Sequence, residues 1–187
     1  MRVGSRMRAG CLALLVAVLA VSSAPLPCKA ASGPEIEAAV QTTLDEFFRK
    51  VGFAHALANR AVAILVFPTV VKAGFGIGGE YGEGALQIGG QTAGYYNLIS
   101  ASIGFQLGAQ ARSVIIMFMT EQALSQFQAT NGWTVGIDGS ITIIAIGVGG
   151  AIDTNSITSP IVGFIFDQKG LMYNLTLEGS KISRIDR

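Results

Sequence analysis

Six glycines stand within the eleven residues from Gly74 to Gly84, and most of them occupy alternate positions. Successive side chains of a strand point to opposite faces. A strand here would carry bulk at Phe75, Ile77 and Tyr81 on one face, and its other face would be nearly bare, so another layer could approach the backbone closely. The pattern predicts a strand whose close-packing face consists of Gly74, Gly76, Gly78, Gly82 and Gly84.

The same stretch contains the letters of a dinucleotide-binding loop, because Gly74, Gly76 and Gly79 match G-x-G-x-x-G. That loop needs a helix directly after its glycines, so that phosphate lies on the helix N-terminus. Here the sequence continues with residues 80–84, EYGEG, which begin a helix poorly and whose two acids would repel phosphate. We therefore expect a strand and no nucleotide site.

Further strands are expected along the rest of the chain. Residues 95–107 repeat the alternation of bulky odd and small or polar even positions. The other apolar runs bounded by turn residues are AVAILVF (61–67, a strand or helix end stopped by Pro68), 113–119, 133–138, 140–149, 160–167 and 171–179. Asp138-Gly139 and residues 167–170 are typical of hairpin turns. The fold class expected is α+β, with an antiparallel, glycine-rich sheet or partial barrel.

Three segments have helical character. Residues 34–51 place apolar side chains on one stripe, begin with acids and end with Arg49 and Lys50, which suits the helix dipole. Residues 53–61 suggest a short second helix, and Thr120 can cap a third over 121–129. The first helix has two interpretations, packing on its own domain or lying on a membrane surface.

The first thirty residues have the layout of a secretory signal peptide: arginines, then an apolar run, then small residues up to Ala30. The run is short for a membrane span. A lipoprotein anchored through Cys28 is the weaker alternative, since Pro25, Leu26 and Pro27 precede that cysteine. The domain expected is then 31–187, a helical segment (31–60) leading a β-rich core (61–187), exported to the periplasm or peripherally bound to membrane.

Charge and residue inventory exclude several functions. Without residues 1–30 the chain keeps nine basic and twelve acidic residues, a balance of −3 that does not suit nucleic acid. No cysteine remains, and His55 is the single histidine, which we interpret as structural. A zinc site of several histidines, a cysteine nucleophile and a G-x-S-x-G elbow are all missing from this sequence. We expect a non-enzyme without metal or cofactor.

From Ala61 onward the sequence resembles the SYLF domain family, also described as the actin-binding domain of certain yeast SH3 proteins. The residues that carry the likeness are AVAILVFPTVVKAGFGIGGEYGEG, YYNLISASIGFQLGAQ, VIIMFMTEQALSQF, NGWTVGID and KGLMYNLTLEGSKI. The resemblance implies lipid binding, since eukaryotic relatives bind phosphoinositide-containing membranes and exported bacterial relatives are usually assigned a lipid-binding role. Some relatives bind actin, which an exported protein would not ordinarily meet.

The resemblance also implies lipid-headgroup contacts. Lys72 stands in the family position V-x-K-A-G-F, and Arg60 and Arg112 are the next basic candidates, together with Arg49 and Lys50. Arg112 precedes an apolar run, so it would need an acidic partner if it were buried. The partner expected is membrane lipid. The alternative is a structural or interaction module of the envelope, which binds a partner protein or a second copy of itself.

Overall fold

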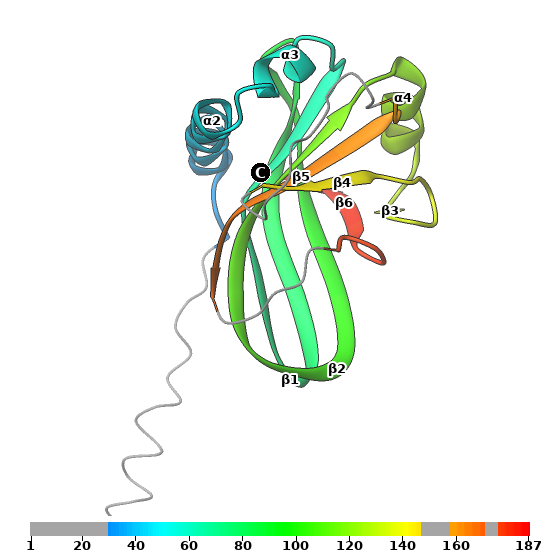
Figure 1. Ribbon diagram of the computed structural model, residues 1–187. Coiled ribbons are helices and arrows are strands. Elements are labelled where there is room, and N and C mark those ends of the chain that lie inside the picture. The colour runs from blue at the N-terminus through cyan, green and yellow to red at the C-terminus, as the bar shows by residue number, and fades with distance from the viewer. Residues whose placement is uncertain (1–29, 147–157, 171–175) are drawn as a thin grey trace, which may run out of the picture. The chain divides into compact units, whose positions relative to one another are not determined.

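The structure is a computed structural model that describes residues 30–146, 158–170 and 176–187 (Figure 1). Three helices and six strands lie in these ranges. Their bounds are α2 Gly33–Lys50, α3 Ala54–Ala58, β1 Ala63–Ile88, β2 Gln91–Phe118, α4 Glu121–Ala129, β3 Trp133–Thr134, β4 Thr142–Ala145, β5 Ile161–Gly170 and β6 Lys181–Ile185. The predicted fold class, mostly antiparallel β with a leading helix, is confirmed. The predicted segments 147–149 and 171–175 lie outside the described residues.

A hairpin of two long strands dominates the sheet. β1 and β2 pair antiparallel from Ala63 opposite Phe118 to Ile88 opposite Gln91, side by side along their whole length (Figure 1). The turn between them is Gly89-Gly90, where positive φ angles of 58° and 80° suit glycine. We call this hairpin the folded ribbon. The predicted glycine-rich strand is therefore present.

Two sequence expectations about the ribbon are wrong. Residues 95–107 and 113–119 form one continuous strand, because the small and polar residues between them, GAQAR, stay in register with β1. Pro68 does not end the first apolar run, since β1 continues through it. The missing N–H of this proline falls at a register shift between Phe67 and Val70, where Ser113 Oγ donates to the Pro68 carbonyl at 2.8 Å.

The two halves of the ribbon have different neighbours. β2 pairs with β6 through residues 95–99 and with β5 through residues 110–118; β3 extends the sheet beyond β6, and β4 extends it beyond β5. Side chains from both halves meet in one apolar core. We call the face of the ribbon that contributes to this core the inner face; it includes Leu65, Phe67, Leu86, Leu98, Val114, Ile116 and Phe118.

The C-terminal part of the sheet differs from expectation. Residues 167–170 do not form a hairpin turn but continue β5, although Asp167 has a φ of +52°. β4 pairs with β5 in parallel, the one parallel strand pair among the described strands. The predicted strand 133–138 is reduced to two residues, because Val135 forms an isolated bridge with Gly139 and residues 136–138 form a turn. A 2.6 Å hydrogen bond from Thr134 N to Asp138 Oδ2 closes this turn. β6, which no pattern indicated, completes the sheet.

Helix α2 packs on the domain through its apolar stripe. Ser32 and Glu35 form a capping box, with Ser32 N donating to Glu35 Oε2 at 2.7 Å. Ile36, Val40 and Phe47 are at most 3% exposed and belong to a second apolar cluster with α3, β4 and β5. Figure 1 shows α2 and α3 on one side of the sheet. Of the two interpretations of this helix, the structure therefore shows packing on its own domain.

Helix α4 closes the main core. Thr120 Oγ1 accepts a hydrogen bond from Ala123 N at 3.2 Å, so the predicted cap is confirmed. Phe127 is 2% exposed and contacts the rings of Phe118 and Trp133, with centroids 4.9 Å and 5.7 Å away. This cluster fills the space between the two halves of the ribbon at the end where β1 begins.

Candidate functional site

Part of the predicted glycine face, at Gly82 and Gly84, is covered by the ribbon itself. A Cβ at Gly84 would overlap the carbonyl oxygen of Val66, and one at Gly82 would lie 2.8 Å from Val70 Cγ2. Both contacts are with the first part of β1, so the strand passes close to itself where side chains are missing. Gly78 is buried as well. At Gly82 and Gly84, what lies against the bare face is the start of the same strand.

Charged residues continue the inner face beyond the apolar core. Arg112 Nη2 donates to Glu80 Oε1 and, at 3.1 Å, to the carbonyl of Thr176. The side chains of Arg112 and Glu80 are 2% and 3% exposed, and Ser100 Oγ donates to Glu80 Oε2 at 3.2 Å. Arg112 is thus buried with the acidic partner that its position required. It presents no charge to a membrane surface.

Lys72 also lies inside the ribbon. It is 5% exposed, and its register partner across the strands is Gln110, which is 2% exposed. Within the described part of the chain, Lys72 makes no ion pair, and the side-chain atoms Oε1 and Nε2 of Gln110 have no hydrogen-bond partner. A surface headgroup contact does not fit this placement of Lys72.

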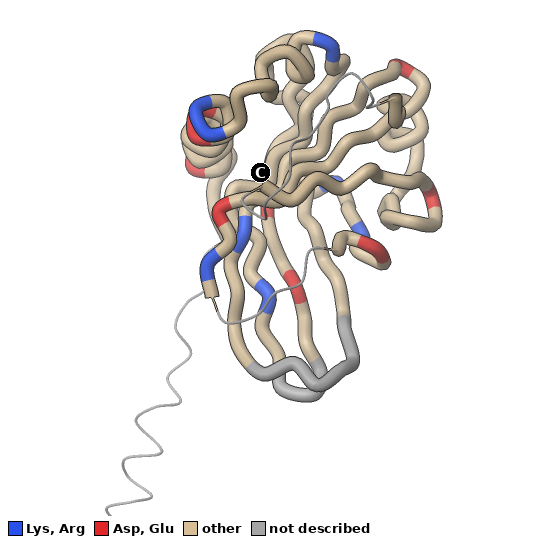
Figure 2. Tube along the Cα trace, in the orientation of Figure 1, with Lys and Arg blue, Asp and Glu red and all other residues tan. Residues whose placement is uncertain are grey.

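The remaining basic candidates lie elsewhere. Arg49 is 71% exposed and lies 3.6 Å from Glu46, while Lys50 lies 3.6 Å from Asp167 of β5. Arg60 is exposed after α3. Figure 2 shows basic residues spread over helices and strands, with no single cluster. The structure therefore brings together Lys72 and Arg112, buried on the inner face, and does not bring the other three candidates to them.

Two rows of side chains on the outer faces were not found from the sequence. In the first row Tyr81, Ile99 and Lys181 are successive register partners on β1, β2 and β6, and Tyr81 and Ile99 are 48% and 47% exposed. In the second row Val71, Ala111 and Lys169 are partners on β1, β2 and β5, with Val71 47% exposed. Each row combines an exposed apolar side chain with an exposed lysine. Only strand pairing shows these combinations, since the members of a row are far apart in the sequence.

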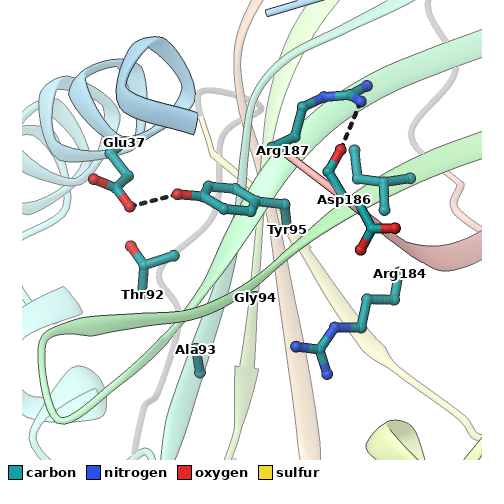
Figure 3. A pocket seen from close by; sticks show the side chains of 9 residues that line it. Glu37, Thr92, Ala93, Gly94, Tyr95, Arg184, Asp186 and Arg187 are labelled. Atoms are coloured by element: carbon teal, nitrogen blue, oxygen red, sulfur yellow. Dashed lines mark hydrogen bonds between the residues drawn. The ribbon is translucent and has the colours of Figure 1, made fainter. Parts of the chain in front are cut away.

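A polar cavity of about 340 Å³ lies where α2 meets the start of β2 and the C-terminal residues 184–187 (Figure 3). Tyr95 points toward α2, and its hydroxyl donates to Glu37 Oε1 at 2.6 Å. This hydrogen bond, with burial and the nearby negative charge, raises the pKa of Tyr95. The other charged residues that line the cavity are Arg184, Asp186 and Arg187, so its charges are balanced and it favours no ion of one sign.

Beside this cavity an ion pair ties the last residue to the ribbon. Arg187 Nη2 donates to Glu83 Oε1, and Tyr81 Oη donates to the same carboxylate at 2.5 Å. Partial burial by itself would raise the pKa of Glu83, but the hydrogen bonds from Arg187 and Tyr81, together with the charge of Arg187, lower it. Glu83 and Glu80 point to opposite faces of β1, so they share no site.

The described residues hold no group of three His, Cys, Asp or Glu side chains that could bind a metal ion. His55 stacks on Phe48, with ring centroids 4.3 Å apart, which agrees with a structural role. Among the described helices, none has the length and apolar character needed to cross a membrane.

The chain was also compared with known proteins. Residues 99–186 match the model of the Ysc84 family, described as Las17-binding protein actin regulator. This part of the chain is similar to Ysc84 (SYLF) domains. The resemblance expected from the sequence is thereby confirmed for this part of the chain. No curated protein matches the chain.

The SYLF match begins at Ile99, in the middle of β2. The whole of β1 and the first eight residues of β2 therefore precede it, although they pair with the matched part along the ribbon. The compact unit that contains the match extends from Ala31 to Arg187. The family description names a binding protein and a regulator of actin, so it describes a binding module.

Proposed function

We propose that this SYLF protein is a non-catalytic module that binds the surface of a lipid membrane in the cell envelope. The observation that carries the proposal is the pair of outer rows, Tyr81–Ile99–Lys181 and Val71–Ala111–Lys169. Exposed aromatic and aliphatic side chains enter the interfacial region of a bilayer, and a lysine beside them can reach lipid phosphates with its flexible stem.

The proposal assigns the contact to the sheet and not to α2. The apolar stripe of α2 is already covered, since Val40 and Phe47 are 0% exposed, and inserting it into lipid would mean removing it from the sheet. Lys72 and Arg112 lie inside the ribbon and take no part in the surface contact. Phosphoinositide selectivity would need a cluster of cations, whereas each row supplies one lysine.

Flotation with phospholipid vesicles tests the proposal. We expect the protein to float with vesicles containing phosphatidylglycerol, and the double variant Tyr81→Ser/Ile99→Ser to bind about tenfold more weakly, because two apolar side chains no longer enter the interface. The matched control is Ile137→Ser, an 81% exposed isoleucine in the turn after β3. Equal flotation of the double variant and the protein, or no flotation with any lipid mixture, would overturn the assignment.

We also propose that residues 1–30 direct export and are removed after Ala30, which places the domain in the periplasm or on a membrane facing it. The support is the order of basic, apolar and small residues in that segment. Mass spectrometry of the protein recovered from cell fractions checks this, with a mature N-terminus at Ala31 as the expected result. Recovery of the intact chain from the cytoplasm would contradict it.

A second candidate is a module that binds a protein of the envelope or a second copy of itself. The description of the matched family supports it, because it names a protein partner. A stable dimer or complex in size-exclusion chromatography without lipid, combined with failure to float, would favour this function over the first. Actin is tested directly by co-sedimentation with filaments, where we expect the protein to stay in the supernatant.

A further inference from the structure

We infer that the inner face of the ribbon contains a binding site for an oxyanion of single negative charge, a carboxylate or a phosphodiester, held by Lys72 and Gln110. The site is independent of the outer rows, so it stands or falls separately from the membrane contact proposed above. Three observations carry the inference: the balance of buried charges among the described residues, the two polar side chains that have no partner there, and the glycines that border them on one side.

The buried charges of the inner face do not balance. Lys72 and Arg112 are cations, and Glu80 is the one buried carboxylate near them among the described residues. Arg112 uses Glu80 as its partner, so no buried carboxylate of the described residues is left to compensate the positive charge of Lys72. Burying a charge without a counter-ion is costly. One negative charge from a ligand would balance the interior.

Gln110 supplies a second donor at the same place. As the register partner of Lys72, it lies beside the lysine on the same face, and antiparallel partners have their Cα atoms within about 5.5 Å. Its Nε2 and Oε1 atoms have no hydrogen-bond partner in the described ranges. An unmade hydrogen bond of a buried amide destabilises a protein. An oxyanion could accept from Gln110 Nε2 and from Lys72 Nζ together.

The same face continues with the pair Val70 and Arg112 on one side of Lys72 and Gln110, whereas the neighbours on the other side carry no side chains. Two residues further along the ribbon, on the same face, Gly74 is paired with Gly108. On β5 the register partner of Gln110 is Gly170, and a Cβ there would overlap the carbonyl of Ala109. The lysine and the glutamine are thus bordered by three glycines, so no neighbouring side chain in these positions competes with a ligand for their polar atoms.

Thermal unfolding with added anions tests the site. We expect sodium acetate or sodium dimethyl phosphate to raise the Tm of the protein above that in sodium chloride of equal ionic strength, by about 3–6 °C at ten times Kd. Lys72→Met should lose this response and be at least as stable as the protein without ligand, because it removes an uncompensated charge. Lys169→Met, which removes a 75% exposed lysine from the outer face, is the matched control and should respond fully.

Dihexanoyl phosphatidylglycerol, below its micelle concentration, distinguishes a lipid headgroup from a free anion. A Tm rise with this lipid but not with dimethyl phosphate would assign the site to a headgroup whose chains add binding energy, and a rise with both would assign it to the anionic group itself. In either case Lys72→Met should weaken binding at least tenfold. An unchanged response of Lys72→Met would overturn the inference.

Two further variants cover the remaining outcomes. Asp153 is the one acidic residue outside the described ranges. If Lys72→Met and Asp153→Asn both lower the Tm, and the double variant lowers it no further, the lysine has a protein counter-ion and the inference is wrong. If Lys72→Met does not fold, Gln110→Leu decides: it should fold and bind acetate about tenfold more weakly, and unchanged binding would overturn the site.

Discussion

Arg112 donates to Glu80 across the inside of the folded ribbon, between β2 and β1, and joins residues 32 positions apart in the sequence. Both side chains are at most 3% exposed. The pair marks the point where the interior changes from apolar to charged, and it separates the packed core from Lys72 and Gln110.

Glu80→Gln should lower the free energy of unfolding by about 3–5 kcal/mol, because the buried guanidinium of Arg112 loses its counter-charge. Urea denaturation measures the change. The double variant Glu80→Leu/Arg112→Met removes both charges and should recover most of the loss. A midpoint for Glu80→Gln equal to that of the unmodified protein would show that the pair does not compensate a buried charge.

Gly84→Ala should destabilise the domain by about 1–3 kcal/mol, because the new methyl group would overlap the Val66 carbonyl and the paired backbone could move away only at a cost in free energy. Gly79→Ala is the matched control in the same strand. Its nearest neighbour would be the Ser100 oxygen at 3.9 Å, so it should be neutral or slightly stabilising. Equal effects of the two substitutions on the denaturation midpoint would contradict close packing at Gly84.

Tyr95→Phe should loosen α2 by about 1 kcal/mol, because it removes the 2.6 Å hydrogen bond to Glu37. Hydrogen exchange is the appropriate measurement, and faster exchange should be confined to the amides of α2. Tyr81→Phe removes a tyrosine hydroxyl that bonds Glu83 and should leave α2 unaffected. Similar exchange in α2 for both variants would show that Glu37 does not hold the helix.

Acid should weaken the attachment of the C-terminus. The pKa of Glu83 is lowered in the folded protein, so its contribution to stability is present above its ordinary pKa of about 4.3 and is lost as the pH falls through the lower folded value. We expect Glu83→Gln to have a lower Tm than the protein at about pH 7 and a similar Tm at about pH 3. A constant difference across this range would contradict the assignment.

Elements governed by short-range patterns could be predicted from the sequence. The helix predicted at 34–51 is α2, and Thr120 caps α4. Local patterns failed where strand pairing decides the conformation. Pro68 lies at a register shift, where its missing N–H interrupts no regular pair, and β5 continues through residues 167–170. β6 is five residues long with two charged side chains, so its pairing with β2 decides its conformation.

The candidate site could be predicted only in part. Lys72 was singled out by its place in the family pattern and Arg112 by the apolar run that follows it. The requirement of an acid for a buried Arg112 led to the correct kind of partner. Glu80 could not be named as that partner, because nothing local relates residues 32 positions apart. The outer rows were missed for the same reason, since each joins three strands.

By itself, the sequence of this protein determined which residues share a face: alternation assigned five of the six glycines of 74–84 to one side of a strand, and a helical stripe assigned Ile36, Val40 and Phe47 to one side of a helix. Such patterns depend on bonds within a few residues of the chain. Only the tertiary structure decided what covers each face, that the start of β1 lies on Gly82 and Gly84 and that Lys72 is enclosed and not exposed. These outcomes depend on contacts between distant segments, whose energies no local pattern contains.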